Sequence, residues 1–154
     1  MKKITAILAA AAIVAMAGTA MAADSNTLTV QASVTGTCKF SSPTSTLNFG
    51  ALDPSVGTNV NGSTTTEFWC TKGVSTDVIG ADDGLNFAGG KRQMKDPVST
   101  DVIPYTLSLN KDGNSNEGPA TPRTLTVAGQ VLGTDYTAKT AGSYSDTVVL
   151  NITP

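Results

Sequence analysis

The residues best suited to chemistry are two cysteines, Cys38 and Cys70, in a chain of 154 residues without histidine. A zinc site needs about four Cys, His or carboxylate ligands, so these two cysteines cannot form one alone. In an oxidising compartment an even number of cysteines favours a disulfide, and the N-terminus described below indicates export. Closing a loop of this length stabilises a fold by about 3–4 kcal/mol in the chain-entropy model. We therefore predict a Cys38–Cys70 disulfide.

Other candidate catalytic groups have simpler structural interpretations. Asp82 and Asp83 are adjacent, but neighbours in an extended chain point opposite ways and Asp-Gly is an ordinary turn. The glycine-rich residues 84–92 lack the spacing of a phosphate-binding loop. A serine nucleophile would have no histidine as its base, and no G-x-S-x-G is present. We expect no enzymatic activity, no catalytic residues, no cofactor and no metal.

The charge and the aromatic content of the chain limit the classes of partner that it is expected to bind. The formal net charge is −2, only 14% of residues are charged, and 5% are aromatic. Nucleic acid is therefore not an expected partner, because such proteins carry a basic stripe. Lys91, Arg92 and Lys95 are interpreted as a solvated patch. Trp69 and Tyr105 can form sugar-stacking platforms, but single aromatic residues in sheet proteins are more often packing residues.

The N-terminus has the pattern of a signal peptide. Lys2 and Lys3 form a short basic region, an apolar run follows, and Ala20-Met21-Ala22 provides the small residues of a cleavage site. The apolar run is too short to be a membrane span. We predict that residues 1–22 are removed during export and that residues 23–154, which contain no second hydrophobic segment, form one domain with its N-terminal extension.

The first stretch after this cleavage point alternates without a break. Leu28, Val30, Ala32 and Val34 are apolar, and the residues between them are threonine, glutamine and serine. In an extended chain this pattern places the apolar side chains on one face. Threonine and valine also favour strands. The pattern predicts a strand over residues 27–35.

The rest of the chain predicts further short strands separated by turns and no helix. The expected strands cover residues 47–50, 63–71, 74–79, 102–109, 123–132 and 144–152. In the second of these, Phe68 and Cys70 share the inward face. Pro104 indicates an edge or the start of a strand, because proline cannot donate to a ladder. The pattern predicts an all-β fold, an antiparallel β-sandwich of immunoglobulin-like architecture.

Several segments, in order along the whole exported chain, resemble the spore coat protein U domain. After the strand that ends at Cys38, these segments are Leu47-Asn48-Phe49-Gly50, residues 64–73, Asp82-Asp83-Gly84-Leu85-Asn86, residues 89–95, Ile103-Pro104-Tyr105-Thr106-Leu107, residues 125–130 and residues 141–150. The family includes the pilins of archaic, Csu-type chaperone–usher pili. The resemblance implies an incomplete immunoglobulin-like sandwich that lacks its last strand, which a periplasmic chaperone and then the next subunit would supply.

This resemblance divides the chain into a donor strand, residues 23–36, and a pilin sandwich domain, residues 37–154. The donor side chains would be Leu28, Val30, Ala32 and Val34. The acceptor groove would be formed by Phe49, Phe68, Leu107, Leu125 and Val148. The implied partners are identical or related pilin subunits, a periplasmic chaperone and an outer-membrane usher. The implied location is the periplasm in transit and then a surface pilus that supports adhesion or biofilm formation.

Two other interpretations compete with a polymer subunit. In a self-complete secreted coat or matrix protein, residues 27–35 would pair within their own domain. An extracellular carbohydrate-binding module would need exposed aromatic side chains on one face, and this chain has few aromatic residues. We prefer the polymer subunit because the alternating strand, the disulfide and the resemblance agree.

Overall fold

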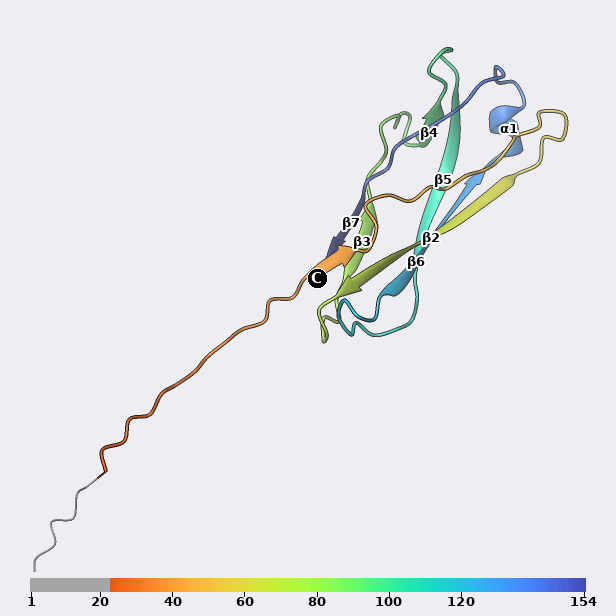
Figure 1. Ribbon diagram of the computed structural model, residues 1–154. Coiled ribbons are helices and arrows are strands. Elements are labelled where there is room, and N and C mark those ends of the chain that lie inside the picture. Colours follow the sequence, from red (N-terminus) through yellow and green to blue (C-terminus); the bar gives the residue numbers. More distant parts are fainter. Residues whose placement is uncertain (1–22) are drawn as a thin grey trace, which may run out of the picture. The chain divides into compact units, whose positions relative to one another are not determined.

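The computed structural model describes residues 23–154, in which residues 34–154 form one unit (Figure 1). Apart from one helical turn, the regular secondary structure of this unit is antiparallel strand. The larger sheet has the strand order β1-β2-β6-β5-β4, and a smaller sheet pairs β3 with β7. The predicted all-β antiparallel sandwich is confirmed. The elements are β1 (Cys38–Phe40), β2 (Val60–Cys70), β3 (Val78–Ala81), β4 (Arg92–Lys95), β5 (Val102–Lys111), β6 (Arg123–Val131), α1 (Gly133–Tyr136) and β7 (Leu150–Thr153).

The middle of the larger sheet follows the alternation of its sequence. Along β2, Thr66, Phe68 and Cys70 are buried while Thr65 and Glu67 are exposed. β2 pairs with β6 along nine residues, and β5 covers the other side of β6. Each strand therefore has one face toward the core and one toward solvent.

The core consists of two clusters that share one residue, Leu107 of β5, as a common neighbour. One cluster lies beside the disulfide and the other beside α1. The buried members of the first are Phe68, Cys70, Leu125 and Val127, and those of the second are Ile103, Tyr105, Val131 and Tyr136.

The disulfide joins neighbouring strands. Cys38 and Cys70 are direct register partners of β1 and β2, with their Cα atoms 4.0 Å apart. This confirms the predicted bond. It fixes the three-residue strand β1 to the edge of the larger sheet, immediately after the N-terminal segment.

The sequence placed several elements incorrectly. The expected strand over residues 74–79 is β3, Val78–Ala81, and only the end of the expected strand over residues 144–152 forms β7. Residues 47–50 belong to no ladder. The expectation of no helix is wrong, because Gly133–Tyr136 forms one turn. Glycine at 133 makes this turn possible, since a Cβ atom there would clash with the carbonyl group of Gly57.

Pro104 lies at the start of a strand, as predicted. It faces Gln93 of β4, and the pairing of β5 with β6 begins only at Thr106. A proline here therefore removes no hydrogen bond from the centre of the sheet.

The segment before β1 has no regular secondary structure in its described residues, 23–37. The predicted signal peptide, residues 1–22, lies outside the described residues. Among residues 23–154, no helix is long and apolar enough to cross a membrane.

Candidate functional site: an open groove beside the last strand

The segment leading into β7 is hydrogen-bonded along one edge only. Ser145 exchanges two backbone hydrogen bonds with Lys95, and the Val149 carbonyl accepts from the N–H that follows β3. The alternate residues, Asp146 and Val148, direct their backbone groups to the other side. Within residues 23–154, those backbone groups have no hydrogen-bond partner. We call residues 144–150 the C-terminal wall, and its free side the open edge.

A second unpaired segment faces this wall. In the described chain, no backbone–backbone hydrogen bond involves residues 42–52. The segment is held instead by Phe49, whose ring lies against Gly62 and Gly129, two register partners in β2 and β6. A Cβ atom on Gly129 would come within 3.0 Å of this ring and 2.9 Å of Leu47. The paired glycines therefore allow residues 45–54, the N-terminal wall, to lie close to the sheet.

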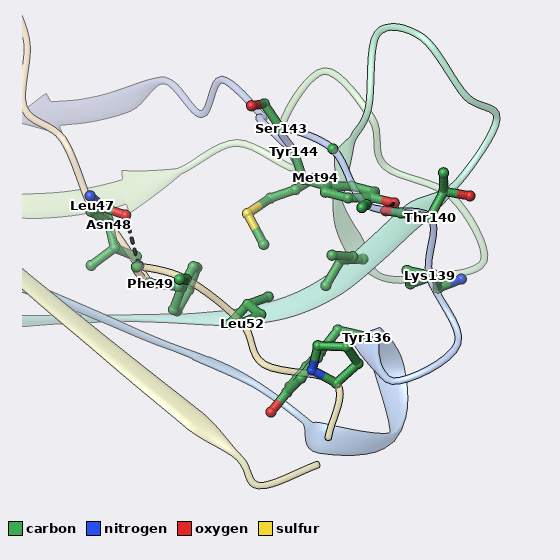
Figure 2. Close-up of a pocket in the computed structure, with 16 residues that line it drawn as sticks. Leu47, Asn48, Phe49, Leu52, Met94, Tyr136, Lys139, Thr140, Ser143 and Tyr144 are labelled. Carbon is green, nitrogen blue, oxygen red and sulfur yellow. Dashed lines mark hydrogen bonds between the residues drawn. The ribbon is translucent and has the colours of Figure 1, made fainter. Parts of the chain in front are cut away.

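The two walls enclose a groove with an apolar floor. It consists of two adjoining hollows of about 520 and 410 Å³, and Phe49, Met94 and Tyr144 line both of them. Figure 2 shows the larger hollow. The floor comes mainly from the inward side chains of β5, which are Ile103, Tyr105 and Leu107. The groove therefore has apolar residues below and unpaired backbone on both sides.

One carboxylate lies in the groove, and its oxygen atoms are already bonded. The Tyr105 hydroxyl donates to Asp146 Oδ2 at 2.7 Å, and Asn86 donates its backbone N–H and side-chain amide to Oδ1. Burial, and then the hydrogen bond to Asp146, raise the pKa of Tyr105, so the phenol remains a proton donor. Asp146 is therefore anchored to the groove floor and does not require a partner from an incoming chain.

The predicted groove residues fall into two sets. Phe49, Leu107 and Val148 line the groove. Phe68 and Leu125 are 0% exposed and lie in the core cluster beside the disulfide. They do not line the groove, which differs from the expectation that they form its surface. Strand alternation identified both residues as inward-facing, but it does not show which inward-facing residues other segments cover.

The sequence reasoning missed several lining residues. Ile103 and Tyr105 alternate with Leu107 along one strand, and this signal was available from the sequence. Tyr144 lines both hollows and falls on the same alternation as Val148 and Leu150, so that signal was available as well. Met94 also lines both hollows, but no sequence pattern marks it. Its position depends on how β4 and the C-terminal wall pack against each other.

The predicted donor side chains are exposed. Leu28 and Val30 are each 83% exposed and Val34 is 85% exposed. Ala32 is also exposed. Alternate positions of an extended chain lie on the same side, and an exposed row of apolar side chains is typical of an interaction site.

The opposite edge of the small sheet is closed by cations from the larger sheet. Lys111 donates to the carbonyl of Asp77 at 2.6 Å, and Arg92 donates to the carbonyls of Ala81 and Asp82. Lys111 also pairs with the Asp77 carboxylate at 2.8 Å. These side chains occupy acceptors that an added strand would need.

Comparison of the sequence with models of known families gives a match over most of the chain. The model of the Spore Coat Protein U domain matches residues 24–151, which include the N-terminal segment, both walls of the groove and the disulfide. A comparison with curated proteins gives no match.

Proposed function

We propose that this chain, which belongs to the Spore Coat Protein U domain family, is a structural subunit of a surface pilus. Its subunits would join when the N-terminal strand of one fills the groove of the next. Pilins of archaic chaperone–usher pili belong to this family. A periplasmic chaperone would occupy the groove first, and an outer-membrane usher would exchange it for the donor strand. The finished polymer would support adhesion or biofilm formation.

The observation that carries this proposal is the open edge of the C-terminal wall beside an apolar floor. Unpaired strand edges are normally shortened, charged or covered, because they recruit other chains. Here Asp146 and Val148 leave backbone groups free, and Leu107 and Val148 leave apolar surface beside them. An added strand satisfies both, with main-chain hydrogen bonds for affinity and alternate side chains for specificity.

The donor segment has the complementary pattern. Its apolar face, from Leu28 to Val34, supplies four side chains at every second position, and its other face is polar. One such strand between the walls would continue the small sheet beyond β7. Because donor and groove are different surfaces, the pairing is head-to-tail and does not close, and it therefore produces a fibre.

Mixed variants test this pairing. Val30→Asp disables the donor face, and Val148→Lys places a charge in the groove. Each variant alone should remain monomeric, while the wild-type exported chain should form a ladder in unboiled gels and by size-exclusion chromatography. An equal mixture of the two variants should stop at dimers, because one intact donor meets one intact groove and the other ends are blocked.

In the matched controls, the same charge is introduced at the neighbouring residue, whose side chain lies on the opposite face of the same segment. Gln31→Asp lies beside Val30 on the polar side of the donor, and Val149→Lys lies beside Val148 on a side chain that is 53% exposed. Both control variants should still form ladders. A wild-type monomer that is independent of concentration would refute the polymer and support a self-complete coat or matrix protein.

A further inference from the structure

We propose that the outer face of the larger sheet binds neutral polysaccharide. Strands β2, β6 and β5 lie side by side there (Figure 1). Their registers align nine outward-facing residues in three rows across the strands, which we call the grid. The rows are Thr106–Gln130–Asn61, Ser108–Ala128–Ser63 and Asn110–Thr126–Thr65.

The grid is polar and uncharged. Every member except Ala128 carries a hydroxyl or an amide, and all nine are exposed or half-buried. The charged side chains of the same strands lie outside these rows, as Glu67 does on β2. The Gln130 amide donates to Asn61 Oδ1 at 2.9 Å, which orients both amides and leaves the Asn61 NH₂ group and Gln130 Oε1 without a partner among the described residues.

The side chains of the grid differ in size from row to row. Its middle row contains only Ser63, Ala128 and Ser108, while the rows on either side contain larger side chains. Rows on one face of a sheet are about 7 Å apart and strands about 4.8 Å apart. The small middle row therefore forms a shallow trough across three strands, bordered by hydroxyls and amides. A chain of sugar rings can lie in it with its own hydroxyls toward both borders.

The composition argues against other classes of partner. The centres of protein–protein interfaces are enriched in aromatic residues, methionine and arginine and depleted in serine, and the grid has the opposite composition. Nucleic acid would require a basic surface. A membrane surface would require apolar or basic side chains. A neutral polymer rich in hydroxyls is the partner whose chemistry matches the grid.

One grid should bind weakly, since it contains no aromatic side chain on which a sugar ring could stack. Repetition would compensate. A polymer presents one grid per subunit, so a long polysaccharide engages many grids at once and gains affinity without new contacts. This gain rests on the proposed pilus function, whereas binding to a single grid does not.

A titration of the monomer tests the site independently of assembly. We would follow backbone amide NMR signals of the exported Val30→Asp chain during addition of cellohexaose, maltohexaose or an oligosaccharide of hyaluronan, which is anionic. Shifts in β2, β5 and β6 with either neutral sugar support the proposal. Shifts only with hyaluronan, shifts located elsewhere, or no shifts overturn it.

Paired lysines provide the matched variants. Ser63→Lys with Ser108→Lys fills both ends of the trough and adds charge at exposed positions, and should weaken sugar binding about tenfold. Thr76→Lys with Thr134→Lys adds the same charge at exposed positions outside the grid and should leave binding unchanged. Equal effects of the two pairs would overturn the site.

Assembly is read separately, by co-sedimentation of wild-type polymer with cellulose. If the wild-type chain does not polymerise, the pilus proposal fails while the monomer titration still decides the fate of the grid. If polymer forms and sediments with cellulose only when the grid is intact, both proposals are supported. Polymer that sediments equally with the grid filled would overturn the role of the grid in the fibre.

Discussion

The two edges of the small sheet differ in whether their backbone groups have hydrogen-bond partners. Along β3, Lys111 and Arg92 reach across from the larger sheet and donate to backbone carbonyls. Along the C-terminal wall, Asp146 and Val148 keep their backbone groups free beside an apolar floor. Edge strands are normally protected, so the contrast supports the proposal that association takes place at the unprotected edge.

The same asymmetry would give the proposed association a direction. A sheet with two open edges accepts strands on both sides, whereas this small sheet offers one edge and one apolar groove. Arg92 and Lys111 close one side without an additional strand, and the chain can leave the other side open for a partner. Variants of either edge test this difference, and they are best made in a Val30→Asp background, which should keep the protein monomeric while leaving the groove intact.

The largest effect should come from the buried charges behind the closed edge. Arg123 and Asp77 are 7% and 6% exposed and lie 3.3 Å apart, and the guanidinium also covers the ring of Phe68. Arg123→Met removes one of the positive charges that neutralise the buried Asp77 carboxylate. It should therefore lower the free energy of unfolding by about 3 kcal/mol. Urea denaturation measures the loss.

A surface pair provides the control for this change. Lys72 and Glu117 lie 2.6 Å apart, but both side chains are exposed. Lys72→Met should therefore change the free energy of unfolding by less than about 1 kcal/mol. Similar losses for the Arg123 and Lys72 variants would show that burial does not distinguish the two pairs.

The next effect acts on the wall of the open groove. In Gly129→Ala, the new methyl group would meet Thr106 O of β5 at 2.8 Å and Leu47 at 2.9 Å, so both β5 and the N-terminal wall must shift away from residue 129. Such overpacking should cost about 1–3 kcal/mol and should weaken binding of a peptide of residues 24–35. Thermal unfolding with and without the peptide measures both effects.

Gly80 is the matched glycine in the small sheet. No atom lies within 4 Å of a Cβ atom built there, and its φ is not positive. Gly80→Ala should leave stability and peptide binding close to those of the parent. If Gly129→Ala also has no effect, the seating of Phe49 on the paired glycines does not hold the wall in place.

A smaller effect should follow from opening the protected edge. Arg92→Gln removes the donors to the carbonyls of Ala81 and Asp82, and should lower the free energy of unfolding by about 1–2 kcal/mol. The freed edge should also increase aggregation on storage, as measured by light scattering. Lys91→Gln, an exposed neighbour in the same turn, is the control and should change neither property.

The features that could be predicted from the sequence depend on the alternation of apolar residues and on the even number of cysteines. Features that depend on contacts between distant segments could not be predicted. Fold class, the disulfide and the inward faces of β2 and β6 follow from local pattern. Alternation shows only that a side chain points inward, so it does not separate the covered residues Phe68 and Leu125 from those that line the groove. Met94, the hydrogen bond from Tyr105 to Asp146 and the seat of Phe49 on Gly62 depend on contacts between remote elements, which no single stretch of sequence specifies.

The smallest expected effect is a change in acid sensitivity at the start of the closed edge. Burial alone would raise the pKa of Asp77, but hydrogen bonds from Lys111 and Asn116 and the charges of Lys111 and Arg123 outweigh it and lower that pKa. A carboxyl group whose pKa is lowered by folding contributes stability above its unfolded pKa and loses it as the pH falls through the folded value. The wild-type fold should therefore lose this contribution below about pH 4.

Lys111→Met isolates this contribution because it removes one cation and one hydrogen bond from Asp77 but leaves Arg123 in place. The pKa of Asp77 should move back toward its ordinary value, so the free energy of unfolding should fall less between pH 5 and pH 3 than in the parent. Urea denaturation at each pH measures the difference, with Lys91→Met as the control for a lost exposed charge. Equal acid sensitivity of the Lys111 variant and its parent would mean that Lys111 blocks the edge only through the Asp77 carbonyl and does not stabilise the carboxylate.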